Sequence, residues 1–438
     1  MPIRHLKKTR GWRACALGLA LVVAGCATTA PPTSTAPAAI PIPTPATSAS
    51  PASPATLATM AQCPAPQACA ACPVCPAPKP EAPVAKVPVL EAVEFDQLSG
   101  WQSDTVEAVW SAFRASCQAL RFQAPWRSAC AEGAKLNRPD SATVRRYFEA
   151  QFRAYRVATP DGATQGLATG YYEPLLRGSR TRRAPYLSPI YAPPDDLLII
   201  DLSAVNPDLK NRRLRGRLEG RRVVPYWSRA DIDRGIASVA GKELLWVDDP
   251  IEAFFLEIQG SGRVQLDSGE TVRLNYMDQN GHPYQSIGRW LIDRGELKSN
   301  EASMQGIIAW ARANPGRVSE LLNQNPSYVF FRELPAGDPS AGPIGALGVP
   351  LTPERSIAVD PAFVPLGAPV FVATTFPNTD TPLERLVMAQ DTGGAIRGPV
   401  RADYFWGFGA DAGAQAGRMR QNLRMWVLLP KDYPVNRN

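Results

Sequence analysis

A long stretch near the start of this chain cannot form a packed core. Residues 27–90 are mostly Ala, Pro, Thr and Ser, and between 31 and 90 there are sixteen prolines but only three charged residues. Such a composition offers few large apolar side chains to bury and many residues that lack a backbone donor. We predict an extended, semi-rigid tether over residues 26–90. A globular fold must therefore come from residues 91–438, a length that suits two domains.

The segment before the tether has the features of an export signal. Its first part is basic and carries no Asp or Glu, and an apolar run follows from Ala14 to Ala24. This run is shorter than the roughly 20 residues that span a bilayer, so residues 1–25 are predicted to be a signal peptide. An ordinary signal peptide cut further along the chain is one interpretation of its end.

The other interpretation, which we favour, is lipidation. The signal ends in Val23-Ala24-Gly25-Cys26, which resembles the lipobox of bacterial lipoproteins. That resemblance implies an acylated Cys26 that anchors the mature protein without a spanning helix. Ala27 follows Cys26, and by the same resemblance the absence of Asp there favours the outer membrane, with the protein facing the periplasm.

Net charge gives little support to a nucleic-acid partner. The chain carries +7, of which residues 1–25 contribute +5, so the remainder carries +7 − 5 = +2. A body at +2 has no strong electrostatic attraction to DNA or RNA, and we expect no nucleic-acid partner. The Arg-rich stretch from Arg212 to Arg222 is predicted to be a solvated surface segment.

The cysteines fall into two groups. Four of them lie in the predicted tether, where the Cys-x-x-Cys spacing suggests a zinc or redox site, whereas the proline-rich surroundings favour disulfides. These four are Cys63, Cys69, Cys72 and Cys75. Cys117 and Cys130 are separate, and in an oxidising compartment we expect them to form a disulfide.

Hydrophobic periodicity in the body predicts a mainly β fold with several helices, built as barrels rather than as a parallel sheet. Asp104 and Glu107 resemble a capping box at the start of a helix that continues to Leu120. Further helices are predicted over 141–155, 284–294 and 301–312. Strands are predicted over 166–172, 252–259, 263–266, 271–276, 355–359, 369–374, 385–390 and 424–429.

The residue types available restrict the chemistry. After the predicted signal only His282 remains, in an Asn-Gly-His-Pro turn, which argues against a histidine-based zinc site or catalytic triad. Walker and EF-hand motifs are absent from the sequence, and we expect neither a metal nor a cofactor. Carboxylates are left as the candidate acid or base.

Three aspartates near the C-terminus stand beside glycine, apolar and aromatic residues: Asp360, Asp391 and Asp403. Partial burial there raises the pKa of a carboxyl group and keeps it protonated for general-acid work. The alternative for each is a structural role in capping a turn.

Asp391-Thr-Gly393 and Asp267-Ser-Gly269 also match the Asp-Thr/Ser-Gly of aspartic proteases, although Gln390 and Glu270 depart from that pattern.

Several ordered motifs resemble the membrane-bound lytic murein transglycosylase A family. The later motifs resemble the three-Asp (3D) domain that ends that family, within residues 360–426. The motifs are Ala168-Thr-Gly-Tyr-Tyr-Glu-Pro174, Ile258-Gln-Gly-Ser-Gly-Arg263, Asn280-Gly-His-Pro-Tyr-Gln-Ser-Ile-Gly288, Asn325-Pro-Ser-Tyr-Val-Phe-Phe331 and Asp391-Thr-Gly-Gly-Ala-Ile-Arg-Gly398. Together they extend over roughly residues 95–430.

The resemblance implies a two-domain body. A double-psi β-barrel domain would be formed by residues 91–174 with 326–438, the 3D segment covering about 355–430. A smaller β-domain would be inserted over residues 175–325, with a groove between the two domains that holds a glycan strand.

The resemblance also implies an activity. The family is a class of carbon–oxygen lyases that cleave the β-1,4 bond between N-acetylmuramic acid and N-acetylglucosamine in peptidoglycan and leave a 1,6-anhydromuramic acid end. The single catalytic Asp of the family corresponds to Asp403, with Asp391 holding a hydrogen-bond network beside it and Asp360 structural. Residues expected to line the groove are Thr169, Tyr171, Gln259, Ser261 and Gly262.

An intramolecular attack by the sugar's own 6-hydroxyl suits a chain with so few catalytic groups, because one carboxyl can serve where hydrolases ordinarily use two. The alternative function is a non-catalytic outer-membrane lipoprotein that binds peptidoglycan through the same groove. In either case the expected partners are peptidoglycan glycan strands and, through the lipid anchor, the outer membrane. Partners in cell-wall synthesis or division are unknown.

Overall fold

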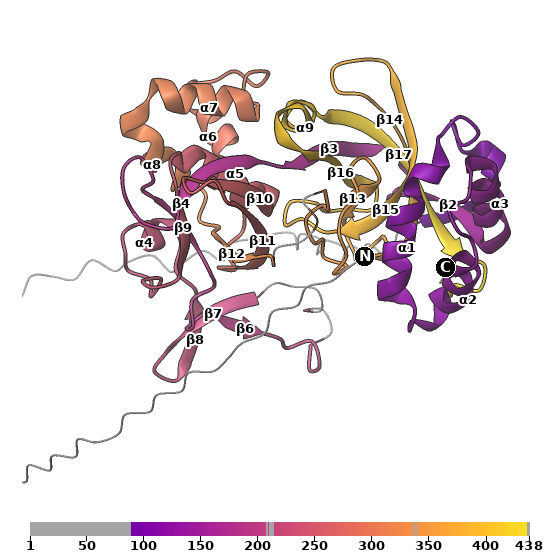
Figure 1. The fold of residues 1–438 in the computed structure, drawn as a ribbon, viewed down its shortest axis with the longest axis horizontal. Coiled ribbons are helices and arrows are strands. Elements are labelled where there is room, and N and C mark those ends of the chain that lie inside the picture. Colours follow the sequence, from indigo (N-terminus) through magenta and orange to yellow (C-terminus); the bar gives the residue numbers. More distant parts are fainter. Residues whose placement is uncertain (1–88, 207–208, 210–213, 336–337, 339, 436–438) are drawn as a thin grey trace, which may run out of the picture. The chain divides into compact units, whose positions relative to one another are not determined.

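The computed structural model describes residues 89–206, 209, 214–335, 338 and 340–435 (Figure 1). The predicted signal peptide, Cys26 and the four tether cysteines lie outside these residues. The first described strand, β1 (Val89–Val93), begins within the last two residues of the predicted tether. Within the described part of the chain, no helix is both long and apolar enough to cross a membrane.

The larger sheet closes on itself. Its strand order is β1-β2-β17-β14-β15-β13-β16-β3, and β3 pairs with β17 as well as with β16. Six strands therefore form a ring, which leaves no free edge between them. We call this sheet, with the helices packed on it, the barrel lobe. Its strands are β1, β2 (Phe152–Ala158), β3 (Gly166–Glu173), β13 (Ser356–Val359), β14 (Pro369–Thr375), β15 (Pro382–Asp391), β16 (Arg401–Phe408) and β17 (Arg420–Pro430).

Helices from the N-terminal part of the body pack on this sheet and share its core. Phe113 and Phe148 are buried against Phe152, with ring centroids 5.2–6.1 Å apart. Cys117 and Cys130 form a disulfide with a Cα–Cα distance of 5.3 Å, which confirms that prediction. The helices of this lobe are α1 (Trp110–Leu120), α2 (Ala124–Ala134), α3 (Ser141–Gln151) and α9 (Gly409–Ala416).

A second lobe is formed by the chain between β3 and β13, and we call it the insert lobe. It contains a six-stranded sheet of order β12-β11-β10-β4-β9-β5 and a three-stranded sheet of order β6-β7-β8, with apolar clusters separate from the barrel core. Its strands are β4 (Leu175–Ser179), β5 (Ser188–Tyr191), β6 (Leu198–Ile200), β7 (Leu214–Glu219), β8 (Arg222–Pro225), β9 (Glu243–Val247), β10 (Ser261–Leu266), β11 (Thr271–Gln279) and β12 (Val329–Glu333). Its helices are α4 (Arg229–Asp233), α5 (Pro250–Gln259), α6 (Ile287–Asp293), α7 (Met304–Ala313) and α8 (Val318–Leu322).

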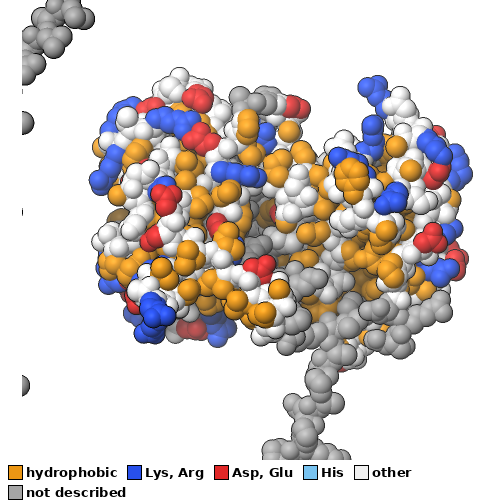
Figure 2. All heavy atoms as spheres, turned by 90° about the horizontal axis from the view of Figure 1, so that it is seen from below, with side chains coloured by type: hydrophobic (Ala, Val, Ile, Leu, Met, Phe, Trp, Pro, Cys, Tyr) orange, Lys and Arg blue, Asp and Glu red, His pale blue; other side chains and the backbone are white. Residues whose placement is uncertain are grey.

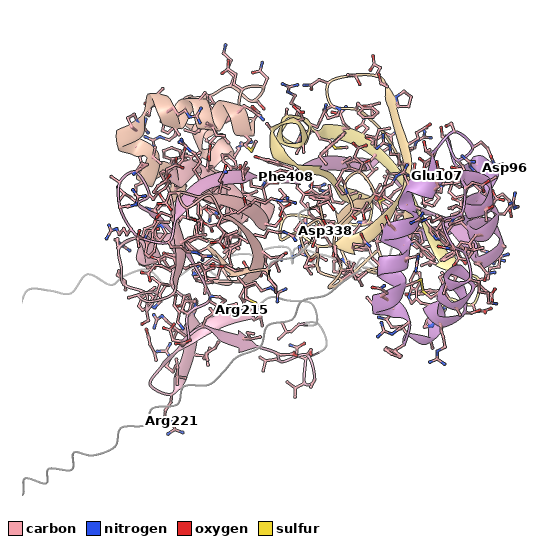
Figure 3. All side chains as sticks on the ribbon, viewed as in Figure 1. Asp96, Glu107, Arg215, Arg221, Asp338 and Phe408 are labelled. Atoms are coloured by element: carbon pink, nitrogen blue, oxygen red, sulfur yellow. A yellow bond between two sulfur atoms is a disulfide. The ribbon has the colours of Figure 1, made fainter. Side chains whose placement is uncertain are left out.

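Basic side chains do not gather on the face seen in Figure 2, where Lys and Arg lie among Asp and Glu. Arg221 and Arg222 are exposed at the β7–β8 hairpin, whereas the side chains of Arg215 and Arg217 are only 14% and 16% exposed, so the predicted solvated segment is confirmed only at its end. Figure 3 labels Arg221 on this hairpin and Arg215 on β7. Arg215 forms an ion pair of 2.7 Å with the buried Asp278.

Three local predictions are wrong. Residues 252–259 form helix α5 rather than a strand, because Asp249 accepts from the Ile251 and Glu252 N–H groups and Pro250 occupies the first turn. Helix α3 ends at Gln151 instead of reaching Tyr155, since Phe152–Ala158 pairs with β1 and β17.

The expected capping box at Asp104 is the third error. Asp104 is 5% exposed, and its carboxylate binds the Arg355 guanidinium at 2.9 Å and accepts from the Leu386 N–H at 2.8 Å. A short 3-10 helix, Val106–Val109, precedes α1 without any side-chain cap. The carboxylate therefore joins distant strands and does not start a helix.

Candidate active site

Asp403 lies within β16 and faces two neighbouring strands. It is in register with Thr169 of the parallel strand β3 and with Ala358 of the antiparallel strand β13. Asp391 is the last residue of β15 and is in register with the same Ala358 from the other side. The two aspartates thus flank β13, about 10 Å apart between Cα atoms for two strand spacings.

A short hydrogen-bond chain ends on Asp403. The Thr169 hydroxyl donates to Asp403 Oδ1, and the Arg401 guanidinium donates to the Thr169 Oγ1 at 2.8 Å. Arg401 is also held by the carbonyl oxygen of Ala402 at 2.6 Å. Because one hydroxyl accepts from the cation and donates to the carboxyl, Thr169 fixes the orientation of Asp403.

Asp391 is held by donors from two other segments. The Tyr171 hydroxyl donates to its Oδ2 at 3.0 Å, and the Ala346 N–H donates to its Oδ1 at 2.9 Å. Tyr171 follows Thr169 by two residues, so both side chains lie on the same face of β3. One strand face therefore supplies a hydrogen bond to each aspartate.

The surroundings of Asp403 favour its protonated form. Burial raises the pKa of Asp403 from 3.8 to about 6. The Thr169 hydrogen bond and the charge of Arg401 oppose this rise, and the charge of Asp391 adds to it. Burial and the two carboxylates also raise the pKa of Tyr171 well above its ordinary value, so its hydroxyl remains a donor. Asp403 is thus a carboxyl group whose proton can be given up and regained near neutral pH.

An apolar cluster contains residues that lie beside both aspartates. Tyr171, Ala358 and Phe405 are packed together with Leu351 and Ile396, and the Tyr171 and Phe405 rings are 5.2 Å apart between centroids. Gly170 lies between the two site residues of β3, where a Cβ atom would come within 2.6 Å of Trp406 Nε1. Only glycine lets β3 approach Trp406 so closely.

The turn between α5 and β10 brings the insert lobe against β3. Gln259 Oε1 accepts from the Tyr172 N–H at 3.0 Å, and Gly260 ends the helix with φ +76°. Ser261 is 5% exposed, and a Cβ atom on Gly262 would lie 2.3 Å from Leu256 Cδ1. Gln259 therefore contacts the strand that carries Tyr171, whereas Ser261 and Gly262 are buried.

A second contact between the lobes lies at the end of β3. The buried Glu173 accepts from Arg263 Nε at 2.9 Å, and the Arg263 guanidinium stacks over the ring of Phe408 at 4.1 Å. Phe408, labelled in Figure 3, is the last residue of β16 and is in register with Glu173. Burial raises the pKa of Glu173 above its ordinary value.

Asp360 and His282 lie apart from this arrangement. Asp360 accepts from the N–H groups of Ala362 at 3.1 Å and Gly398 at 2.9 Å, which ties the end of β13 to the loop after β15. His282 lies in a turn, where its Nε2 contacts the Tyr226 carbonyl oxygen at 2.7 Å. Among the described residues, no group of three or more His, Cys, Asp or Glu side chains is placed to hold a metal ion.

The aspartic-protease interpretation is wrong. Asp267 follows β10 of the insert sheet, where its carboxylate binds the Arg183 guanidinium. Hydrogen bonding to Ser179 and the neighbouring Arg183 lower its pKa below the ordinary value. Asp391 belongs to the barrel sheet. The two carboxylates therefore do not form the proton-sharing pair that such a protease needs.

Two contributors to the site escaped the sequence analysis. Arg401 stands two residues before Asp403 and could have been found from that spacing alone. The Ala346 N–H could not, because a backbone group in a loop carries no signal in its side chain.

The fold and the site define a two-lobed β protein in which a closed barrel carries adjacent aspartates. Two family models match it: the MltA specific insert domain over residues 167–332 and the 3D domain over residues 355–429. Both match the segments whose motifs suggested the resemblance.

Relatives and solved structures agree. Membrane-bound lytic murein transglycosylase A of Vibrio cholerae is 30% identical over 310 residues, which is 68% of this chain and 74% of the relative. The protein of that name from Escherichia coli K12 is 34% identical over 269 residues, 59% of this chain and 64% of the relative, so the match covers less than two thirds of that protein. The chain belongs to the membrane-bound lytic murein transglycosylase A (MltA) family.

Two crystal structures are similar to this fold. MltA from Neisseria gonorrhoeae has a TM-score of 0.68 at 40% identity, covering 79% of this chain and 94% of that one. E. coli MltA with bound chitohexaose has a TM-score of 0.57 at 27% identity, covering 75% and 91%.

Proposed function

We propose that this protein is a peptidoglycan lytic transglycosylase. It would cleave the β-1,4 bond between N-acetylmuramic acid and N-acetylglucosamine and leave a 1,6-anhydromuramic acid end. The observation that carries the proposal is Asp403, half-buried, oriented by Thr169 and with a pKa raised to about 6. Family membership and the chitohexaose bound to the E. coli relative support a glycan strand as the ligand.

Asp403 would act first as the acid and then as the base. Its carboxyl group gives its proton to the glycosidic oxygen as the bond from that oxygen to C1 of muramic acid breaks. The resulting carboxylate then takes the proton of the 6-hydroxyl of the same muramic acid while that oxygen bonds to C1. The proton count returns to its starting value, and neither water nor a cofactor is consumed.

Asp391 would support this cycle without exchanging a proton with the sugar. Its carboxylate, held by Tyr171 and Ala346, places a fixed negative charge beside Asp403. Thr169 and Tyr171 bind the aspartates from β3, and Gln259 at the end of α5 binds the Tyr172 N–H. Ser261 and Gly262 would shape the substrate groove by packing. We propose a structural role for Asp360, since both of its backbone contacts tie loops together.

We further propose that the six-stranded ring is a double-psi β-barrel. The ring contains two parallel pairs, β3 with β16 and β13 with β15, in an otherwise antiparallel arrangement. The proposed domains are 91–174 with 326–438 for the barrel and 175–325 for the insert, although β12 in the second barrel segment pairs with β11 of the insert sheet. The chain before them would be a signal peptide (1–25) and a tether (26–90).

The proposed location is the outer membrane, by a lipid on Cys26, facing the periplasm. The names of the relatives describe them as membrane-bound, which supports attachment. Labelling cells with a fatty-acid analogue tests this, because wild-type protein should take up the label and Cys26→Ser should not. Label on the Cys26→Ser protein would disprove the assignment.

The activity is tested by incubating the purified protein with peptidoglycan sacculi and analysing the released fragments by mass spectrometry. We expect muropeptides that end in 1,6-anhydromuramic acid. Reducing sugar ends as the sole product would indicate a hydrolase instead. Binding to sacculi with no released fragment would support the alternative, a non-catalytic peptidoglycan-binding lipoprotein.

A further inference from the structure

A segment between β12 and β13 connects the insert sheet to Asp391. It covers residues 340–347, which we call the strap, and Asp338, labelled in Figure 3, lies just before it. The strap has no regular secondary structure, yet hydrogen bonds from both lobes fix its backbone. Its position therefore depends on both lobes at once.

The insert lobe holds the strap through β11. Asn275 is 4% exposed, and its side-chain amide binds both sides of Ile344: the Ile344 N–H donates to Oδ1 at 2.8 Å, and Nδ2 donates to the Ile344 carbonyl at 3.1 Å. Arg273 Nη2 donates to the carbonyl oxygens of Ala341 at 2.8 Å and Gly342 at 2.7 Å. The two hydrogen bonds between Asn275 and Ile344 fix the orientation of the Ile344 backbone.

The barrel lobe meets the strap only two residues further along. The Ala346 N–H donates to Asp391 Oδ1 at 2.9 Å, and the Leu347 N–H donates to the Gln390 carbonyl at 3.0 Å. With the Tyr171 hydroxyl on Oδ2, each oxygen of Asp391 has a donor. Ala346 thus stands between Ile344, which the insert lobe holds, and Leu347, which the barrel lobe holds.

We propose that Asn275 is a positioning residue for the reaction, which through the strap aims the Ala346 N–H at Asp391 and keeps that carboxylate ionised and fixed beside Asp403. This inference rests on the proposed function, in which the two aspartates act together. Asn275 itself touches neither aspartate in any contact described above, so its effect passes through the strap backbone.

The proposal has a consequence for pH dependence. A hydrogen bond to the charged form stabilises a carboxylate, so loss of the Ala346 N–H raises the pKa of Asp391 and leaves it neutral more often. The charge of Asp391 is one of the influences that raise the pKa of Asp403. Charged or titratable groups that act on this pair include Tyr171 on β3 and Arg401 on β16, with Arg420 of β17 acting on Arg401.

The test compares Asn275→Ala with Asn280→Ala in the full-length protein. Asn280 is also a buried amide of the insert lobe, 1% exposed, but its side chain binds Trp227, His282, Pro326 and Tyr328 rather than the strap. With glycan strands purified from sacculi, we expect Asn275→Ala to lower kcat on the order of 10- to 100-fold with little change in KM. In Asn275→Ala, the fall in activity on the alkaline side of the pH–rate profile should move to lower pH. In Asn280→Ala, this fall should stay at the wild-type pH.

A second pair of variants applies if Asn275→Ala does not fold. Ala346→Pro removes the N–H that donates to Asp391 Oδ1, and Ala346→Gly keeps it. We expect the proline variant to show the same lowered kcat and the same shift of the alkaline side of the pH–rate profile as Asn275→Ala. The glycine variant should match wild type in both.

Two results would overturn the proposal. One is a wild-type kcat and a wild-type pH–rate profile in the folded Asn275→Ala and Ala346→Pro proteins. The other is a shift of the pH–rate profile in Asn280→Ala as large as that in Asn275→Ala. Asp403→Asn is measured alongside. If that variant keeps full activity, the proposed function has failed; if it is inactive while the strap variants are normal, only the strap inference has failed.

Discussion

Thr169 and Asp403 face each other in register across the parallel strands β3 and β16, and the Thr169 hydroxyl donates to the Asp403 carboxyl. The two residues are 234 positions apart in the sequence. Their meeting requires the chain to leave the barrel after β3, form the insert lobe and return. The hydrogen bond that orients Asp403 for the proposed chemistry therefore forms only when the chain has folded as a whole.

Replacing Thr169 should change the pH dependence of activity. The Thr169 hydrogen bond lowers the pKa of Asp403, so Thr169→Val removes a stabilising donor from the carboxylate and raises that pKa further. We expect the falling limb of kcat/KM to shift to higher pH in Thr169→Val. Thr169→Ser keeps the hydroxyl and should retain the wild-type limb; a shift to lower pH in the valine variant would contradict the assignment.

The wild-type protein should lose activity as pH rises through about 6. The reasoning is that the acid must be protonated in the free enzyme, and burial sets the pKa of Asp403 at about 6. Initial rates of anhydromuropeptide release between pH 4 and 9 measure this limb. A rate that continues to rise to pH 9 is incompatible with Asp403 as the acid.

The aspartates themselves could be identified from the sequence, since almost every other catalytic residue type is missing. The raised pKa of Asp403 could not be predicted, because it depends on burial and on Thr169 and Asp391, which come from two other strands. The donors to Asp391 could not be predicted either, because they come from β3 and from a loop backbone. Sequence patterns record which groups are available, whereas long-range packing decides which of them meet.

Asp104 should be essential for stability rather than for activity. It forms a buried ion pair with Arg355, both residues being 5–6% exposed, and it also binds the Leu386 N–H. Asp104→Ala leaves the arginine unpaired and should lower the free energy of unfolding by about 3–5 kcal/mol in urea denaturation. The exposed Asp96 is the matched control, where Ala should change stability by less than about 0.5 kcal/mol. Equal effects at the two positions would refute the role given to Asp104.

The disulfide between Cys117 and Cys130 should also stabilise the barrel lobe. Its two cysteines are 13 residues apart, and closing a loop of this size stabilises a fold by about 2–3 kcal/mol, largely through the unfolded state. The Cys117→Ser/Cys130→Ser double variant should unfold at lower urea concentration with an unchanged rate of glycan cleavage at 25 °C. A loss of activity in the folded variant would show that the bridge also shapes the site.

Local patterns predicted most strands of the barrel lobe, and their failures have physical causes. The strands β13, β14, β15 and β17 all overlap predicted ranges because short apolar runs lie between turn residues. Residues 252–259 are apolar enough for a strand, but Asp249 and Pro250 start a helix there. The signal, the tether up to residue 88 and their cysteines lie outside the described residues, so no structure tests those predictions.

The central claim is that one carboxyl group, Asp403, performs both proton transfers, and its most direct test is the Asp403→Asn protein. Because the pKa of Asp403 is raised from 3.8 to about 6, ionisation of this group lowers stability as the pH rises from about 4 to 6, and the neutral amide should leave stability at pH 8 unchanged or raise it by up to roughly 3 kcal/mol. The variant should therefore remain folded.

Mass spectrometry of sacculus digests then decides the matter. Wild-type protein should release fragments ending in 1,6-anhydromuramic acid, and folded Asp403→Asn should release none above the buffer control. Anhydro fragments released by Asp403→Asn at the wild-type rate would contradict the assignment of Asp403.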